Sequence, residues 1–119
     1  MSLAKKLNLK PGATLRVVAK PKGIELGDVA TATNGEAVLV FARTAADLAR
    51  AMPAIDAARA DRIAWIAYPK AGQMETDLSR DILAKLVSAN GVQPVRQVAL
   101  DDVWSALRFR PGKRAAKKK

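Results

Sequence analysis

The residues best suited to binding a ligand come directly after the apolar stretches of this chain. One such stretch is RIAWIAYPK at 62–70, followed a few residues later by the start of a helical pattern. Basic side chains and the free backbone N–H groups at a helix start can together hold a phosphate or a carboxylate. The candidate anion-binding residues are Lys20, Arg43, Thr44, Tyr68, Lys70, Thr76 and Asp77.

The stretch around Tyr68 also has a purely structural interpretation. Pro69 could simply end a strand, Lys70 could stay solvated, and Thr76 or Asp77 could only cap the next helix. The residues do not decide between this interpretation and the anion site, so both stay open at this point.

A second group with possible chemistry is Asp101, Asp102 and Trp104. Paired carboxylates can do acid–base work when their pKa values are pushed apart. Adjacent residues of a tight turn point in different directions, however, and aspartate is a favoured turn residue. The two tryptophans, Trp65 and Trp104, both lie in strand patterns, which favours a place in the core. We therefore assign no catalytic residue.

Two absent residue types restrict the possible chemistry further. The 119 residues include no histidine and no cysteine. This excludes a Ser-His-Asp triad, thiolate nucleophiles, disulfides and the commonest metal ligands. The acidic residues are scattered, so we expect no metal site and no cofactor, and the sequence favours a protein that is not an enzyme.

The positive charge of the chain is concentrated at its two ends. The net charge is +10, yet residues 11–107 carry 11 basic and 11 acidic side chains. The segment 111–119, PGKRAAKKK, is low in complexity, and we expect a disordered tail there. Such a tail can bind nucleic acid or another polyanion without reading its sequence. It could equally serve only to keep the protein in solution. The tail residues in question are Lys113, Arg114, Lys117, Lys118 and Lys119.

The elements that would position these groups follow from the apolar patterns. Continuous apolar or β-branched runs predict buried strands, and the pattern after Asp77 predicts the clearest helix, followed by a hairpin closed at Asp101 and Asp102. Pro53 should divide the helical pattern that starts at Thr44. The alternation predicts one α/β domain over 1–110, with a mostly parallel sheet, helices on both faces and a final antiparallel strand. The predicted strands are 14–20, 37–42, 62–68, 92–100 and 103–110, and the predicted helices are 3–9, a divided one from 44, and 76–90.

The pieces LAKKLNLKPG, WIAYPK, TDLSRDIL and VALDDVWSALRFR resemble an uncharacterised bacterial family, the domain of unknown function 3052. The resemblance covers about residues 3–110 and implies a class I methyltransferase-like Rossmann fold, in which a last antiparallel strand inserts into the sheet. It implies no reaction. In such methyltransferases the first strand leads into a glycine-rich turn, whereas here AKPKGIELG follows it. Adenosylmethionine should therefore not bind in the usual manner.

Together these observations predict a small methyltransferase-like Rossmann domain, non-enzymatic or vestigial, with a basic tail that attracts nucleic acid. One alternative is a small-molecule or anion-binding domain, or a degenerate enzyme, centred on Tyr68, Lys70 and Thr76. Another is a protein interaction module. The chain has no apolar run long enough for a membrane helix, and its N-terminus lacks the apolar core of a signal peptide. We therefore expect a cytoplasmic protein.

Overall fold

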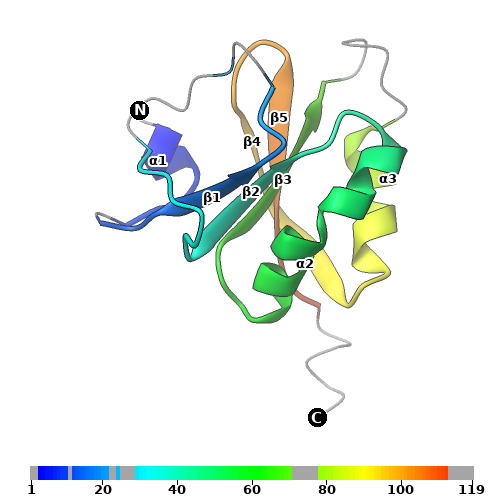
Figure 1. Ribbon diagram of the computed structural model, residues 1–119. Helices are drawn as coiled ribbons and strands as arrows, with labels where there is room; N and C mark the ends of the chain where they lie inside the picture. Colours follow the sequence, from blue (N-terminus) through cyan, green and yellow to red (C-terminus); the bar gives the residue numbers. More distant parts are fainter. Residues whose placement is uncertain (1–2, 11, 22–23, 25–28, 71–77, 113–119) are drawn as a thin grey trace.

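The structure, a computed structural model, describes residues 3–10, 12–21, 24, 29–70 and 78–112. Five strands form one sheet in the order β1-β2-β3-β5-β4 (Figure 1). Their bounds are β1 Leu15–Val18, β2 Ala37–Phe41, β3 Ala64–Pro69, β4 Val92–Ala99 and β5 Trp104–Pro111. The α/β class is thus confirmed.

The sheet is mixed, which corrects the expected mostly parallel arrangement. β1 pairs with β2, and β2 with β3, in parallel. β5 runs antiparallel to both of its neighbours, β3 and β4. Because β5 lies between β3 and β4, two of the four strand pairings are antiparallel, and the sheet is mixed rather than mostly parallel.

The hairpin between β4 and β5 is confirmed, and its turn depends on Asp101. The carboxylate oxygen Oδ1 of Asp101 accepts hydrogen bonds from the backbone N–H groups of Val103 at 2.8 Å and Trp104 at 2.7 Å. A short acidic side chain that binds the backbone two and three residues ahead stabilises a tight turn. Asp101 is therefore a turn residue, as the structural interpretation held.

Four short helical segments accompany the sheet: α1 Leu3–Lys6, the 3₁₀ helix η1 Ala45–Arg50, α2 Met52–Arg59 and α3 Arg80–Ser88. Pro53 lies in the first turn of α2, where its missing N–H costs nothing. The expected division of this helical pattern is confirmed, with η1 before Ala51 and α2 after it.

The helix α3 begins later than its sequence pattern indicated. Ser79 is its N-cap, and the Ser79 hydroxyl accepts a hydrogen bond from the N–H of Ile82 at 3.2 Å. The expected cap at Thr76 or Asp77 is therefore wrong, and those two residues lie outside the described part. Leu83 and Val87 are buried against the sheet, whereas Ile82 remains 46% exposed. Ile82 therefore lies outside the apolar face of α3 that packs on the sheet.

Two apolar clusters cover the two faces of the sheet. On the face that we call the α2–α3 face, Val40, Ile66 and Leu107 pack with residues of those two helices. On the opposite face, the α1 face, Leu39, Trp65 and Ala106 pack with Leu7. Figure 1 shows α1 on the other side of the sheet from α2 and α3. Among the described residues the α1 face carries only one four-residue helix, so the expected layer of helices is thin there.

A buried hydrogen bond holds the N-terminal segment on the α1 face. The indole Nε1–H of Trp65 donates to the carbonyl oxygen of Leu7 at 3.0 Å, and both side chains are fully buried. Trp65 and Trp104 are thus core residues, as expected. No helix in the described part of the chain is long and apolar enough to cross a membrane.

Candidate functional site

The first candidate residue, Lys20, uses its charge within its own turn. Its ammonium Nζ donates to the carbonyl oxygen of Ile24 at 2.7 Å. The preceding residue, Ala19, has a positive φ of 63°, so the chain turns sharply as it leaves β1. Lys20 therefore closes this turn, and its ammonium is already committed to a backbone acceptor.

The amides at Arg43 and Thr44 are also occupied. The carboxylate oxygen Oδ2 of Asp47 accepts hydrogen bonds from the backbone N–H of Arg43 at 3.0 Å and of Thr44 at 3.2 Å. An anionic ligand at this position would meet the Asp47 carboxylate and be repelled by it. The helix that starts here, η1, is a six-residue 3₁₀ helix, so it offers little dipole to compensate.

The remaining predicted residues divide between the end of β3 and the undescribed segment. The backbone N–H of Lys70 donates to the carbonyl oxygen of Val103 at 2.7 Å, which extends the pairing of β3 with β5. The Lys70 side chain is half-buried. Thr76 and Asp77 lie outside the described residues. The five described candidates lie at or just after the carboxyl ends of the neighbouring parallel strands β1, β2 and β3, and several of their N–H donors already bind within the chain.

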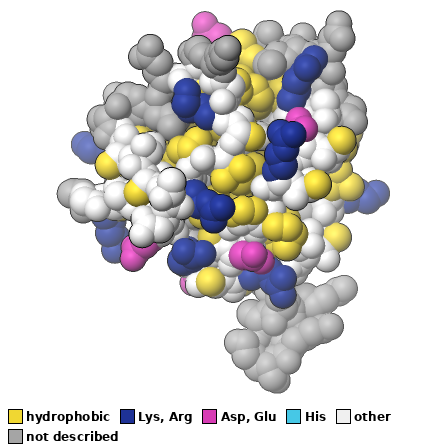
Figure 2. Space-filling model, viewed as in Figure 1, with side chains coloured by type: hydrophobic (Ala, Val, Ile, Leu, Met, Phe, Trp, Pro, Cys, Tyr) yellow, Lys and Arg dark blue, Asp and Glu magenta, His cyan; other side chains and the backbone are white. Residues whose placement is uncertain are grey.

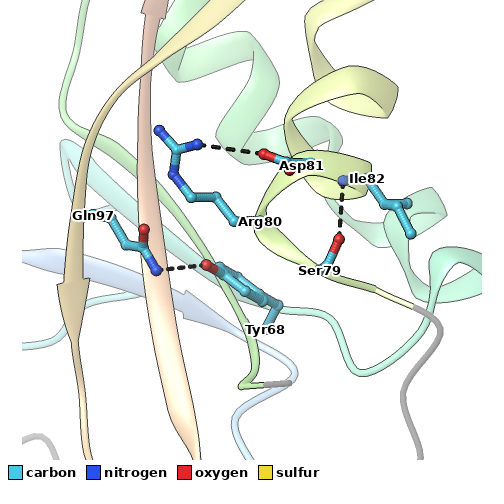
Figure 3. Close-up of polar contacts among 6 residues, drawn as sticks. All are labelled: Tyr68, Ser79, Arg80, Asp81, Ile82 and Gln97. Carbon is cyan, nitrogen blue, oxygen red and sulfur yellow. Dashed lines mark hydrogen bonds and ion pairs between the residues drawn. The ribbon is translucent and has the colours of Figure 1, made fainter. Parts of the chain in front are cut away.

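Tyr68 is the exception, because it belongs to a compact polar group on the α2–α3 face. Its side chain is 2% exposed, and its hydroxyl accepts a hydrogen bond from the Gln97 amide Nε2 at 2.9 Å (Figure 3). Burial raises the pKa of the Tyr68 phenol, while Arg80 and the Gln97 hydrogen bond partly oppose this effect. Gln97 and Arg80 were not among the predicted site residues.

A row of three arginines, Arg96, Arg108 and Arg110, lies on the α1 face. Arg108 faces Arg96 directly in the antiparallel pairing of β5 with β4. Arg110 follows Arg108 by two positions, and side chains two apart on a strand point to the same face. We call these three residues the arginine row.

The members of the arginine row have unequal partners. Arg110 makes two hydrogen bonds to the Asp61 carboxylate, at 3.0 and 3.2 Å. Arg108 is half-buried, and its buried Nε has no hydrogen-bond partner. Burial, followed by repulsion from Arg110, lowers the pKa of Arg108, and Arg96 adds to that repulsion. Asp61 opposes this shift from a distance, but among the described residues no carboxylate forms an ion pair with Arg108, which stays charged as arginine does in proteins.

A hollow near the arginine row is lined in part by the N-terminal segment. Lys10 from the N-terminal segment lines a hollow of about 240 Å³ together with Asp61 and Arg62. Asp61 in turn binds Arg110, and this hydrogen bond lowers the pKa of the Asp61 carboxyl. The Asp61 carboxylate therefore binds Arg110 at the edge of a hollow that Lys10 also lines.

The strand β5 ends close to the arginine row. β5 continues to Pro111, and the N–H of Gly112 donates to the carbonyl oxygen of Gly91 at 2.9 Å. The described strand and its hydrogen bonding thus include Pro111 and Gly112. The predicted tail residues Lys113, Arg114, Lys117, Lys118 and Lys119 lie outside the described part.

The sequence contained a partial signal for the arginine row. The alternation Leu107-Arg108-Phe109-Arg110 places both arginines on one face of a strand. The charge distribution, however, groups these two arginines with the basic C-terminal residues. The pairing of Arg96 with Arg108 depends on strand order and on the register shift between Pro94 and Arg96, which no local pattern reveals.

The acidic side chains of the described residues are dispersed. They contain no group of three or more aspartate or glutamate side chains that could hold a metal ion. Basic side chains are spread over the face in Figure 2, and acidic ones are fewer.

No protein-family model, curated protein or solved structure matches this chain.

Proposed function

We propose that this protein is a non-enzymatic domain that binds nucleic acid through its phosphates, using the arginine row and the basic tail. The observation that carries the proposal is Arg108, a half-buried cation set between Arg96 and Arg110 with an unpartnered Nε. Like charges directly opposite one another destabilise a sheet. A phosphate bound between them would relieve this repulsion.

Arginine is well suited to this role. Its planar guanidinium presents several N–H donors in a fixed fork that matches phosphate oxygens. The half-buried position of Arg108 restricts its movement, so less freedom is lost when an anion binds. The lysines of the tail sequence would add charge without the planar fork of arginine. We therefore propose binding that depends on salt and is indifferent to base sequence.

We also propose that the scaffold is of the methyltransferase-like type and belongs with the bacterial family of unknown function 3052. The insertion of the last, antiparallel strand between β3 and β4 supports this proposal. Adenosylmethionine would not bind in the usual manner, because the turn after β1 is closed by the Lys20 hydrogen bond to Ile24. The sharp turn at Ala19 likewise differs from a glycine-rich loop that approaches a cofactor.

The test is a salt titration of duplex-DNA binding by the full-length protein and its arginine variants. Five tail cations, Arg96 and Arg108 could neutralise about seven phosphates, which gives a log–log salt slope of about −6. Arg108→Gln and Arg96→Gln should each reduce the steepness of that slope by about 0.9. Arg59→Gln is the matched control, because Arg59 is an exposed arginine at the end of α2.

Two results would contradict the proposal. If Arg59→Gln weakened binding as much as Arg108→Gln did, the attraction would be a diffuse effect of net charge. If the full-length protein did not retard DNA even at low salt, the nucleic-acid function itself would be wrong.

A further inference from the structure

The hydroxyl of Tyr68 retains a hydrogen-bond donor that nothing in the described part of the chain accepts. The Gln97 amide donates to the Tyr68 oxygen, so the phenolic hydrogen must point elsewhere. Tyr68 is almost completely buried, and a buried hydroxyl normally finds a partner for its hydrogen. The phenolic hydrogen is therefore available to an acceptor on a bound ligand.

Ser105 supplies a second donor beside it. Ser105 is the residue directly opposite Tyr68 in the pairing of β5 with β3, so both side chains lie on the α2–α3 face. Ser105 is 5% exposed and is the only buried polar residue in the described part of the chain. Its hydroxyl makes no hydrogen bond with those residues either, which leaves two neighbouring hydroxyl groups without acceptors.

Arg80 brings a positive charge to the same place. It extends from the start of α3 over the Tyr68–Gln97 pair (Figure 3), and its charge opposes the rise in the Tyr68 pKa. Its only ion pair with the described residues is a long contact of 3.5 Å with Asp81, and both side chains are more than half exposed. An exposed pair of this kind is weak, so the Arg80 guanidinium remains available to a ligand.

We propose that Tyr68, Ser105 and Arg80 bind the carboxylate group of a small molecule. All three present donors, and among the described residues only Asp81 competes for one of them, through its long contact with Arg80. The site has one cation, and Asp81 beside it offsets part of that charge, so a single negative charge fits better than a doubly charged phosphate. This site lies on the opposite face of the sheet from the arginine row and does not depend on the nucleic-acid function.

The single tyrosine of the chain makes the proposal directly testable. The full-length protein would carry an isotope label on the ring carbon that bears the Tyr68 hydroxyl, and its NMR signal would be followed during titration with sodium acetate. Sodium chloride at equal ionic strength and sodium phosphate would be the comparison titrations. We expect a saturable shift with acetate, a weaker response to phosphate and none with chloride.

Two variants and one control connect this shift to the proposed donors. Ser105→Ala and Arg80→Gln should each weaken acetate binding about tenfold or more, because each removes a hydrogen bond to a charged group. Arg59→Gln removes an exposed arginine elsewhere and should leave binding unchanged. Ser105→Ala changes one buried oxygen and Arg80 is exposed, so both proteins should fold.

Three results would overturn the proposal. The first is the absence of a saturable acetate shift in the full-length protein. The second is a shift that both variants retain with unchanged affinity. The third is tighter binding of phosphate than of acetate, which would refute the carboxylate assignment.

Discussion

Replacing Arg108 by methionine should make the protein more stable and at the same time a poorer binder of nucleic acid. The buried Nε of Arg108 has no partner, and leaving a polar group in this state costs about 1–3 kcal/mol. The side chain is only half-buried, so we take the lower end of that range. Repulsion from Arg96, directly opposite, adds about 0.2–1 kcal/mol.

Methionine keeps the length of the apolar stem, so little packing should be lost in Arg108→Met. The expected net gain in the free energy of unfolding is about 1 kcal/mol, or a rise in Tm of about 3–6 °C for a domain of this size. Thermal unfolding followed by circular dichroism would measure the gain. A DNA salt titration would show a slope less steep by about 0.9.

The neighbouring Arg110→Met is the matched control for this variant. Arg110 is exposed and has the Asp61 carboxylate as its partner, so its replacement should leave stability unchanged or slightly lower it. If Arg108→Met lowered Tm by several degrees, the unpartnered guanidinium would not be a source of instability. The argument that it is kept for binding would then fail.

Three further predictions concern other parts of the molecule. Titration of the phenolate absorbance should give an apparent pKa for Tyr68 above 10.0, and Gln97→Leu should raise this pKa further; an unshifted pKa would contradict the burial of Tyr68. Because the folded state favours the neutral phenol, the contribution of Tyr68 to stability should be lost as pH rises from about 10 through the raised pKa. Gly35→Ala should destabilise the domain by about 2 kcal/mol or more in chemical denaturation, because the added Cβ would lie 2.7 Å from the backbone nitrogen of Arg16. In the control Gly112→Ala the nearest atom is 3.4 Å from the added Cβ, so the loss in the free energy of unfolding should be clearly smaller. Equal losses in the two variants would refute the reasoning. Truncation after Gly112 should leave Tm nearly unchanged and reduce the DNA salt slope by about 4, because it removes five basic residues and none of the described contacts; unchanged DNA affinity would exclude a role for the tail.

Local patterns were sufficient to predict most of the elements and much of the core. Residues 37–41 and 64–68 are continuous apolar runs, and such runs are typical of strands buried on both faces. Asp101 and Asp102 form a short link that predicted the antiparallel hairpin, and Pro53 predicted the break before α2. These features depend on neighbours in sequence, which is why the sequence alone determines them.

Element ends were less predictable, because they depend on competition between nearby residues. Thr76, Asp77 and Ser79 are all suitable N-caps, and nothing in their order indicates that Ser79 begins α3. The sequence likewise did not indicate that Asp47 would occupy the amides of Arg43 and Thr44 as a ligand would. Its own carboxylate takes the place that we expected for an external anion.

The candidate sites were decided by the tertiary structure. Composition established that histidine and cysteine chemistry is excluded and that the basic charge lies at the chain ends. Only the insertion of β5 between β3 and β4 places Arg108 opposite Arg96 and Ser105 opposite Tyr68. These pairs join residues far apart in sequence, and their register is determined by strand order and by the bulge near Pro94. Strand order is a property of the whole packed sheet, so no single stretch of the sequence contains it.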